Sequence, residues 1–158
     1  MASYRKLTRP IREVMPVALG IPPKASSPRV SKSMKGNKAN GTKPEISLRK
    51  ALRSRRLAGY RLNFRKIPGS PDICYPSKKV AIFVNGCFWH RCPHCKLTLP
   101  RSNKVFWRNK FNRNKERDRL KTKRLRNAGW KVLTVWECQI YSNADKVTTK
   151  ISKYIKLS

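Results

Sequence analysis

The chain has 158 residues, and its 39 lysines and arginines against seven acidic residues give it a formal net charge of +32. This charge favours a polyanionic partner, with nucleic acid as the first candidate and an anionic membrane surface as the second. No apolar run approaches the roughly 18 residues of a membrane span, which excludes an integral membrane protein. The odd number of cysteines, five, argues against a secreted disulfide framework, so we expect an intracellular protein.

Residues 1–41 are basic, contain many Pro, Ser, Gly and Asn residues, and offer little apolar surface for burial. We therefore expect a flexible basic arm, followed by one folded domain at residues 42–158. Met34 lies in a polar part of the arm, where its side chain could act as an apolar wedge in DNA. The alternative is a solvated tail that contributes only charge.

The first helix is predicted to begin after Thr42 and to end at Gly59. Thr42 is a suitable N-cap, and Pro44 fits the first turn because its missing N–H is not needed there. Glu45 complements the positive end of the helix dipole. A rough apolar stripe along the segment indicates that one side of the helix is buried.

Three strands are predicted to follow this helix. The apolar residues of 60–67 alternate strictly, which predicts a strand with one buried face. After a turn with two prolines, residues 72–75 begin a second strand, and residues 80–84 form a third. The third run is apolar without alternation, so we expect a central strand with both faces buried.

A long, strongly basic helix is predicted from Ser102 to about Ala128, with Ser102 as its cap and Gly129 at its end. Residues 130–136 are interpreted as another interior strand, and residues 144–155 as a terminal helix. Strands followed by a helix and a returning strand predict an α/β fold, with a mixed sheet flanked by helices.

Cysteine and histidine residues concentrate between positions 87 and 95, and one cysteine follows the last predicted strand. This pattern predicts a structural zinc site, which needs four Cys or His ligands in a closed tetrahedron. Cys95 and His94 compete for one ligand position. The candidate ligands are Cys87, Cys92, His94, Cys95 and Cys138. The alternative is a set of reduced cysteines that only pack, and Cys74, in the middle of a strand, is expected to do so.

In a chain with so few acids, the remaining carboxylates are candidates for chemistry. Asp72 heads a predicted strand, where a rigidly held carboxylate can bind Mg²⁺ beside a phosphate. His90 follows Cys87 by three residues, so a zinc site would fix its position, and its imidazole can act as a general base. Taken singly, each acid is explained as well by a salt bridge. Taken together with the charge, these residues indicate metal-assisted phosphodiester hydrolysis.

Aromatic residues lie beside these candidates. Phe88 and Trp89 stand between Cys87 and His90 in a polar loop, and Trp107 lies on the basic helix. Aromatic rings flanked by cations can stack on bases or wedge between them. The alternative is that they cover the edge of the sheet.

Several of these segments resemble the very short patch repair (Vsr) endonucleases, in order and at matching intervals. The likeness runs from about Met34 to Cys138, and it is carried by residues 68–76, 80–90, 106–118 and 129–138. The resemblance implies a fold like that of type II restriction endonucleases with one structural zinc. It also implies an enzyme that nicks one DNA strand 5′ to the thymine of a T:G mismatch, which begins repair of deaminated 5-methylcytosine.

Site residues follow from the resemblance by position. It assigns Mg²⁺ binding to Asp72 and the backbone carbonyl of Val84, the general base to His90, and further active-site carboxylates to Asp118 and Glu45. The aromatic wedge would comprise Phe88, Trp89 and Trp107, with Met34 from the arm. The zinc ligands would be Cys87, Cys92, His94 and Cys138, with Cys95 able to replace His94. Asn85 departs from the family pattern, because a well-known member has a second active-site histidine there, and Val84 replaces a threonine.

The expected protein is a Mg²⁺-dependent, zinc-containing DNA mismatch endonuclease that acts as a monomer on double-stranded DNA. We expect it in the cytoplasm, associated with the nucleoid, with mismatch-repair proteins as candidate partners. The first alternative is a Vsr-like homing or site-specific nicking endonuclease that acts on intact duplex. The second is a catalytically inactive zinc DNA-binding module, against which the joint presence of Glu45, Asp72, His90 and Asp118 argues.

Overall fold

The computed structural model describes residues 23–24, 27–28, 31–32 and 40–156. Met34 and most of the predicted arm at residues 1–41 lie outside the described residues, so the predictions made for them stay predictions. Among the helices that the structure describes, none is long and apolar enough to cross a membrane.

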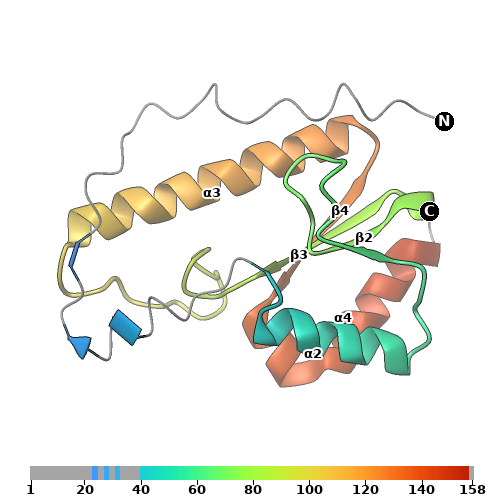
Figure 1. Ribbon diagram of the computed structural model, residues 1–158, viewed down its shortest axis with the longest axis horizontal. Helices are drawn as coiled ribbons and strands as arrows, with labels where there is room; N and C mark the ends of the chain where they lie inside the picture. Colours follow the sequence, from blue (N-terminus) through green and yellow to red (C-terminus); the bar gives the residue numbers. More distant parts are fainter. Residues whose placement is uncertain (1–22, 25–26, 29–30, 33–39, 157–158) are drawn as a thin grey trace.

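A four-stranded mixed sheet with the order β1-β2-β3-β4 forms the middle of the fold (Figure 1). Its strands are β1 (Arg61–Leu62), β2 (Ile73–Tyr75), β3 (Val80–Asn85) and β4 (Lys131–Trp136). The first three strands are antiparallel neighbours, and a short 3-10 turn, η3 (Pro76–Lys78), connects β2 to β3. β3 and β4 are parallel, so the chain needs a long crossover between them, which contains a helix.

Three helices cover the two faces of this sheet. Helix α3 (Lys104–Asn127) lies on one side, and α2 (Lys43–Ser54) and α4 (Glu137–Lys156) pack together on the other (Figure 1). The prediction of a mixed α/β fold with helices on a sheet is therefore confirmed.

β3 carries the core on both of its faces, as its uninterrupted apolar run predicts. Val80 and Ile82 belong to the core shared with α2 and α4, whereas Ala81 and Phe83 belong to the core beneath α3. Cys74 lies in the α3 core with no exposed surface, and burial raises the pKa of its thiol to about 12. Its predicted packing role is confirmed.

Helix α2 begins as predicted but ends early. Thr42 is the N-cap and forms a capping box with Glu45. The helix ends at Ser54 rather than at Gly59, because Arg56 adopts a φ of 56°. The Leu57 amide then donates to the Leu52 carbonyl at 2.9 Å, which closes the helix without a glycine.

The predicted strand at residues 60–67 is wrong for most of its length. Only the exposed pair in β1 is a strand, because Asn63 has a φ of 45° that turns the chain. Tyr60 packs against the α2 and α4 core, whereas Phe64 and Ile67 pack beneath α3. The alternating apolar residues therefore serve two cores and not one face of a strand.

Three further predictions need correction. Asn103, not Ser102, occupies the N-cap position of α3; its φ is 52°, and its side chain forms no capping hydrogen bond. β4 is an edge strand of the described sheet, although α3 and α4 cover its faces and bury much of it. Helix α4 begins at Glu137, directly after β4, and kinks at Asn143. The side chain of Asn143 accepts the Lys146 amide at 2.8 Å, so the segment predicted as the whole terminal helix is the part after this kink.

Candidate active site and metal centre

Asp72 immediately precedes β2, beside the end of β3. Its Oδ2 atom accepts a hydrogen bond of 2.7 Å from the Val84 backbone N–H. Burial raises the pKa of Asp72 from its ordinary 3.8 to about 6, an effect that this hydrogen bond reduces. The charge of Glu45 raises the same pKa, and the ammonium of Lys121 lowers it. A bound cation would therefore stabilise a carboxylate that is fixed in direction and partly desolvated.

Glu45 brings a second carboxylate close to Asp72. Its side chain is only 5% exposed and accepts hydrogen bonds from the Gly41 N–H at 2.9 Å and the Thr42 hydroxyl at 2.7 Å. These bonds hold the start of α2 and fix the direction of Glu45. Carboxylate oxygens and a backbone carbonyl, such as that of Val84, are the donors that Mg²⁺ prefers. The residues present thus fit the predicted cation.

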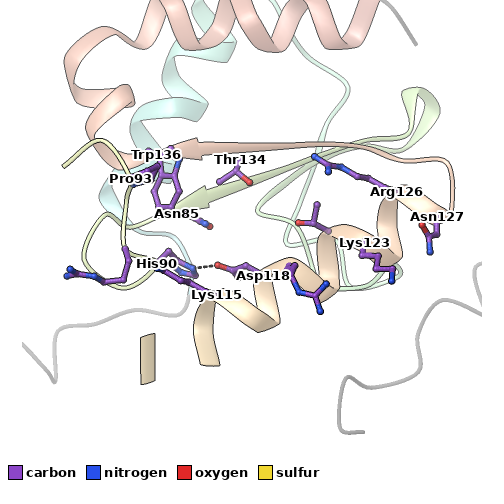
Figure 2. A pocket seen from close by; sticks show the side chains of 13 residues that line it. Asn85, His90, Pro93, Lys115, Asp118, Lys123, Arg126, Asn127, Thr134 and Trp136 are labelled. Atoms are coloured by element: carbon purple, nitrogen blue, oxygen red, sulfur yellow. Dashed lines mark hydrogen bonds and ion pairs between the residues drawn. The ribbon is translucent and has the colours of Figure 1, made fainter. Parts of the chain in front are cut away.

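His90 and Asp118 form the second part of the site. His90 lies in the loop after β3, and its Nδ1 atom is 2.5 Å from Oδ2 of Asp118 on α3 (Figure 2). The other oxygen of Asp118, Oδ1, is 2.7 Å from Nζ of Lys121. Burial opposes ionisation of Asp118, but the bonds from His90 and Lys121 lower its pKa below the usual value. Asp118 is therefore a carboxylate at neutral pH and accepts the Nδ1–H of His90.

An open pocket of about 600 Å³ lies on one side of this pair, between α3 and the ends of β3 and β4 (Figure 2). Asn85, at the end of β3 and only 6% exposed, lines it together with His90 and Asp118. The cationic lining residues are Arg91, Lys115, Arg119, Lys123 and Arg126. Positive charge thus surrounds the pocket, which makes it suitable for an anion.

The predicted aromatic residues form one cluster. Phe88 and Trp89 of the loop contact Trp107 of α3, with ring centroids 5.7 and 6.0 Å from it. Phe111 is buried beneath them, 5.3 Å from Phe88 and 5.6 Å from Trp107. Asn114 fixes the loop by donating to the Trp89 carbonyl at 2.9 Å. The three predicted rings are each only partly buried, so part of their surface remains available to a ligand.

Four cysteines form a compact cluster that joins the loop to the start of α4. The Sγ atoms of Cys87, Cys92, Cys95 and Cys138 all lie within 4.8 Å of one another. Zinc with about 2.3 Å bonds to sulfur requires tetrahedral S–S separations of about 3.8 Å. The separation of Cys92 and Cys138, 3.7 Å, already has this value. His94 is exposed and outside the cluster, so the structure favours Cys95 as the fourth ligand.

Backbone groups arrange the cluster. The Cys138 N–H donates to the sulfur of Cys87 at 3.4 Å, and the Cys87 N–H donates to Glu137 at 3.1 Å. Burial opposes ionisation of Cys92, but the N–H groups of His94 and Cys95 lower the pKa of its thiol. Burial raises the pKa values of Cys87 and Cys138. A metal would overcome this cost, because thiols bind metals as thiolates.

Comparison with known proteins identifies the family of this chain. The model of the family described as DNA mismatch endonuclease Vsr matches residues 25–97. The type II nicking enzyme V.NmeDIP of Neisseria meningitidis serogroup C is 37% identical over 126 residues, which cover 79% of this chain and 84% of that enzyme. The chain belongs to the DNA mismatch endonuclease Vsr family.

Two further relatives of this Vsr-family chain are named as a nicking enzyme and as a mismatch endonuclease. The type II nicking enzyme V.NaeI of Lentzea aerocolonigenes is 44% identical over 117 residues, which cover 68% of this chain and 66% of that enzyme. The DNA mismatch endonuclease Vsr of Escherichia coli (strain K12) is 39% identical over 111 residues, which are 70% of each chain.

The structure of this Vsr-family member also contains site residues that the sequence analysis did not single out. Lys121 links the two halves of the candidate site, and its position three residues after Asp118 on one helix face is a signal that spacing alone could have provided. Phe111 lies four residues after Trp107, so helical spacing alone could also have indicated that the two rings are in contact. Asn114 and Glu137 bond to backbone groups of the loop, and no sequence pattern marks such contacts.

Proposed function

We propose that the protein is a DNA endonuclease that nicks one strand of a duplex 5′ to the thymine of a T:G mismatch, by Mg²⁺-dependent hydrolysis. One observation carries the proposal: Lys121 pairs with Asp118 and packs against Gly69, three residues before Asp72, which supports a single site formed by the predicted cation site and the His90–Asp118 pair. The family membership and the names of the relatives support the nicking activity. The helix-covered mixed sheet is compatible with the restriction-endonuclease-like fold, which remains part of this proposal.

Asp72 and the carbonyl of Val84 would hold the Mg²⁺, with the charge of Glu45 close by. Bound there, the ion supplies positive charge to the scissile phosphate and to the leaving 3′-oxygen. The Val84 N–H holds the Asp72 carboxylate in one direction, and Glu45 is held by its bonds to the start of α2. Both acids are thus in place before DNA binds, which reduces the reorganisation that the reaction requires.

His90 acts as the general base. Its Nδ1–H is bonded to Asp118, so in the neutral imidazole Nε2 carries the lone pair that accepts a proton from the attacking water. The bond from the His90 backbone N–H to the Gly86 carbonyl, at 3.2 Å, holds the loop that carries the ring. Asn85 lies beside His90 at the pocket and has no ionisable group, so we assign it a hydrogen-bonding role and not proton transfer.

DNA would contact two adjoining surfaces. The aromatic cluster of Phe88, Trp89 and Trp107 offers partly exposed rings that can enter the base stack where a mismatch weakens it. The cations of the pocket offer binding sites for backbone phosphates next to the catalytic pair. Because a T:G pair stacks and pairs less well than a matched pair, insertion of the rings costs less there, which supports mismatch selectivity.

The four cysteines would hold a structural zinc. Their cluster encloses the loop that carries both the aromatic wedge and His90, so the ion would fix these side chains and take no part in hydrolysis. Thiolate ligands suit a reducing compartment, and a duplex-DNA substrate suits the nucleoid, so we expect a cytoplasmic, nucleoid-associated protein. We also expect it to work as a monomer.

The test is nicking of end-labelled duplexes, identical except for a T:G or a T:A pair, by purified protein with Mg²⁺. Nicking confined to the thymine strand of the T:G duplex is the expected result. Cleavage of one particular matched duplex sequence would show that the protein is a site-specific nicking enzyme of intact duplex and not a mismatch-repair enzyme. Binding without cleavage of any duplex would leave an inactive DNA-binding module and contradict the proposed activity.

A further inference from the structure

Lys121 is partly buried at the centre of the candidate site. Its side chain is only 12% exposed, compared with 18% for Asp118 and 19% for His90. Its ammonium lies 4.2 Å from the centre of the Phe83 ring, which provides a favourable cation–π contact. A charged side chain with so little exposed surface needs compensation, and Asp118 and Phe83 supply it.

We propose that Lys121 is a positioning residue of the nicking reaction, which acts through Asp118 to hold His90 in its base-competent orientation. The inference rests on the proposed function, and it assigns a role to a residue outside the predicted catalytic set.

The contacts of Asp118 show how Lys121 acts. A carboxylate can turn about its last side-chain bond, and that rotation is broad. Here Oδ1 forms an ion pair with Lys121 at 2.7 Å, although the angle is not that of a hydrogen bond, and Oδ2 is 2.5 Å from His90, so each oxygen has its own partner. Without Lys121, the Oδ1 side of Asp118 has no ion-pair partner among the described residues, and the carboxylate is free to turn away from the imidazole.

The surroundings hold the Lys121 side chain in place. Its aliphatic stem passes over Gly69, where an added Cβ would lie 2.9 Å from the Cδ of Lys121. Gly69 also has a φ of 77°, so a glycine suits this turn for two reasons. The turn before Asp72 and the middle of α3 therefore approach closely at Lys121, and this contact brings the ammonium near both carboxylates.

A second pair on α3 shows what an ordinary ion pair of the same spacing looks like. Glu116 and Arg119 are also three residues apart and are paired at 2.7 Å, but their side chains are 38% and 61% exposed. Exposed pairs of this kind contribute little. The Asp118–Lys121 pair differs because it is much less exposed and shares its carboxylate with a histidine.

Single-turnover nicking by Lys121→Met, Lys121→Arg and Asp118→Asn proteins tests the proposal, with Lys153→Met as the control. Lys153 is exposed on α4, across the sheet from α3, and its loss removes the same charge. We expect Lys121→Met to slow the chemical step roughly 10–100-fold with unchanged duplex affinity, as loss of an outer contact to a reacting group typically does. Lys121→Arg should recover most of the rate, and the control should match the parent protein.

The double variant Asp118→Asn/Lys121→Met separates action through Asp118 from direct contact with DNA. If Lys121 works through Asp118, the double variant should be no slower than Asp118→Asn alone. Three results would each overturn the proposal. They are a double variant whose rate loss is the product of the two single losses, a Lys121→Met protein that binds duplex more weakly but nicks it as fast, and a Lys121→Met protein with an unchanged nicking rate. The double variant also removes both charges of the partly buried pair, so it leaves no unpaired carboxylate. It can therefore be measured even when Lys121→Met alone does not fold.

A readout independent of activity is the ¹⁵N NMR spectrum of the His90 ring, in a chain with only two histidines. The parent protein should show the tautomer protonated at Nδ1, and Lys121→Met should show a mixture of tautomers. An identical His90 spectrum in both proteins would contradict the inference. If the parent protein nicks no duplex, the proposed function fails, and this spectrum still decides the role of Lys121.

Discussion

At the scale of single residues, Asp72 connects the catalytic proposal to the stability of the free protein. Burial raises its pKa from 3.8 to about 6, so the folded state holds a proton on Asp72 more tightly than the unfolded state does. The contribution of Asp72 to the free energy of unfolding is therefore greatest below about pH 4, and it decreases as the pH rises through about 6. A free energy of up to about 3 kcal/mol corresponds to this pKa difference.

Asp72→Asn should therefore raise the free energy of unfolding at pH 7, by roughly 1–3 kcal/mol, because it removes a buried charge. The same substitution should change little at pH 4, where Asp72 is protonated in the folded state. Urea unfolding at the two pH values measures both effects.

Mg²⁺ provides the control for this experiment. Added Mg²⁺ should stabilise the parent protein and not the Asp72→Asn variant, since only the parent retains the carboxylate. Equal stabilisation of both proteins would show that the ion binds elsewhere, and a less stable variant at pH 7 would contradict the buried-charge explanation.

At the scale of elements, the loop after β3 depends on the cysteine cluster. It has no helix or strand of its own between β3 and α3, and it carries the aromatic residues and His90. Its cysteines meet Cys138, which α4 places there by beginning directly after β4. A metal would thus fix the loop to the carboxyl end of the parallel strand pair.

The zinc prediction is tested by metal content and thermal unfolding of Cys95→Ala and His94→Ala proteins. We expect about one zinc in the parent and in His94→Ala, and a loss of zinc with a lower melting temperature in Cys95→Ala. A strong chelator should unfold the parent protein, because metal binding to such a site is coupled to folding.

The reverse result for the two variants would make His94 the ligand and Cys95 dispensable. A parent protein that folds without any metal would refute the structural site.

The elements also show what sequence patterns can predict. The N-cap at Thr42 and the uninterrupted apolar run of β3 are local signals, and both were interpreted correctly. The alternation at residues 60–67 misled because two separate cores receive its side chains, a fact that depends on the tertiary arrangement. The choice between His94 and Cys95 likewise depends on a turn geometry that spacing does not determine.

At the scale of the whole molecule, contacts between distant segments assemble the site. His90 and Asp118 are 28 residues apart, and Cys87 bonds to groups 50 and 51 residues later. The family resemblance assigned both His90 and Asp118 to the active site, and the cysteine pattern made Cys138 a candidate ligand, whereas the hydrophobic pattern indicated neither. Lys121 is one of 39 cations, and its spacing from Asp118 acquires meaning only when the contacts of that carboxylate are known.

The large positive charge leads to a prediction about salt. Lys115, Lys123 and Arg126 line the pocket, and their side chains make no ion pair or hydrogen bond to the part of the chain that the structure describes. If each binds a phosphate, replacing all three with Gln should reduce the slope of log affinity against log salt by about 2.7. Replacing three exposed α4 lysines, Lys150, Lys153 and Lys156, is the matched control.

Titration of a fluorescent duplex at several salt concentrations measures these slopes. Equal slopes for the two triple variants would show that the pocket is no special site for DNA.

Metal-dependent hydrolysis at Asp72 and His90 is tested most directly by mapping the product of a T:G duplex labelled at both ends of the thymine strand. With Mg²⁺, the parent protein should yield one nick 5′ to the mismatched thymine, with a 5′-phosphate and a 3′-hydroxyl. His90→Ala should form the same product roughly 10²–10⁴-fold more slowly. Cleavage that persists in a metal chelator, or a His90→Ala protein as fast as the parent, would contradict this mechanism.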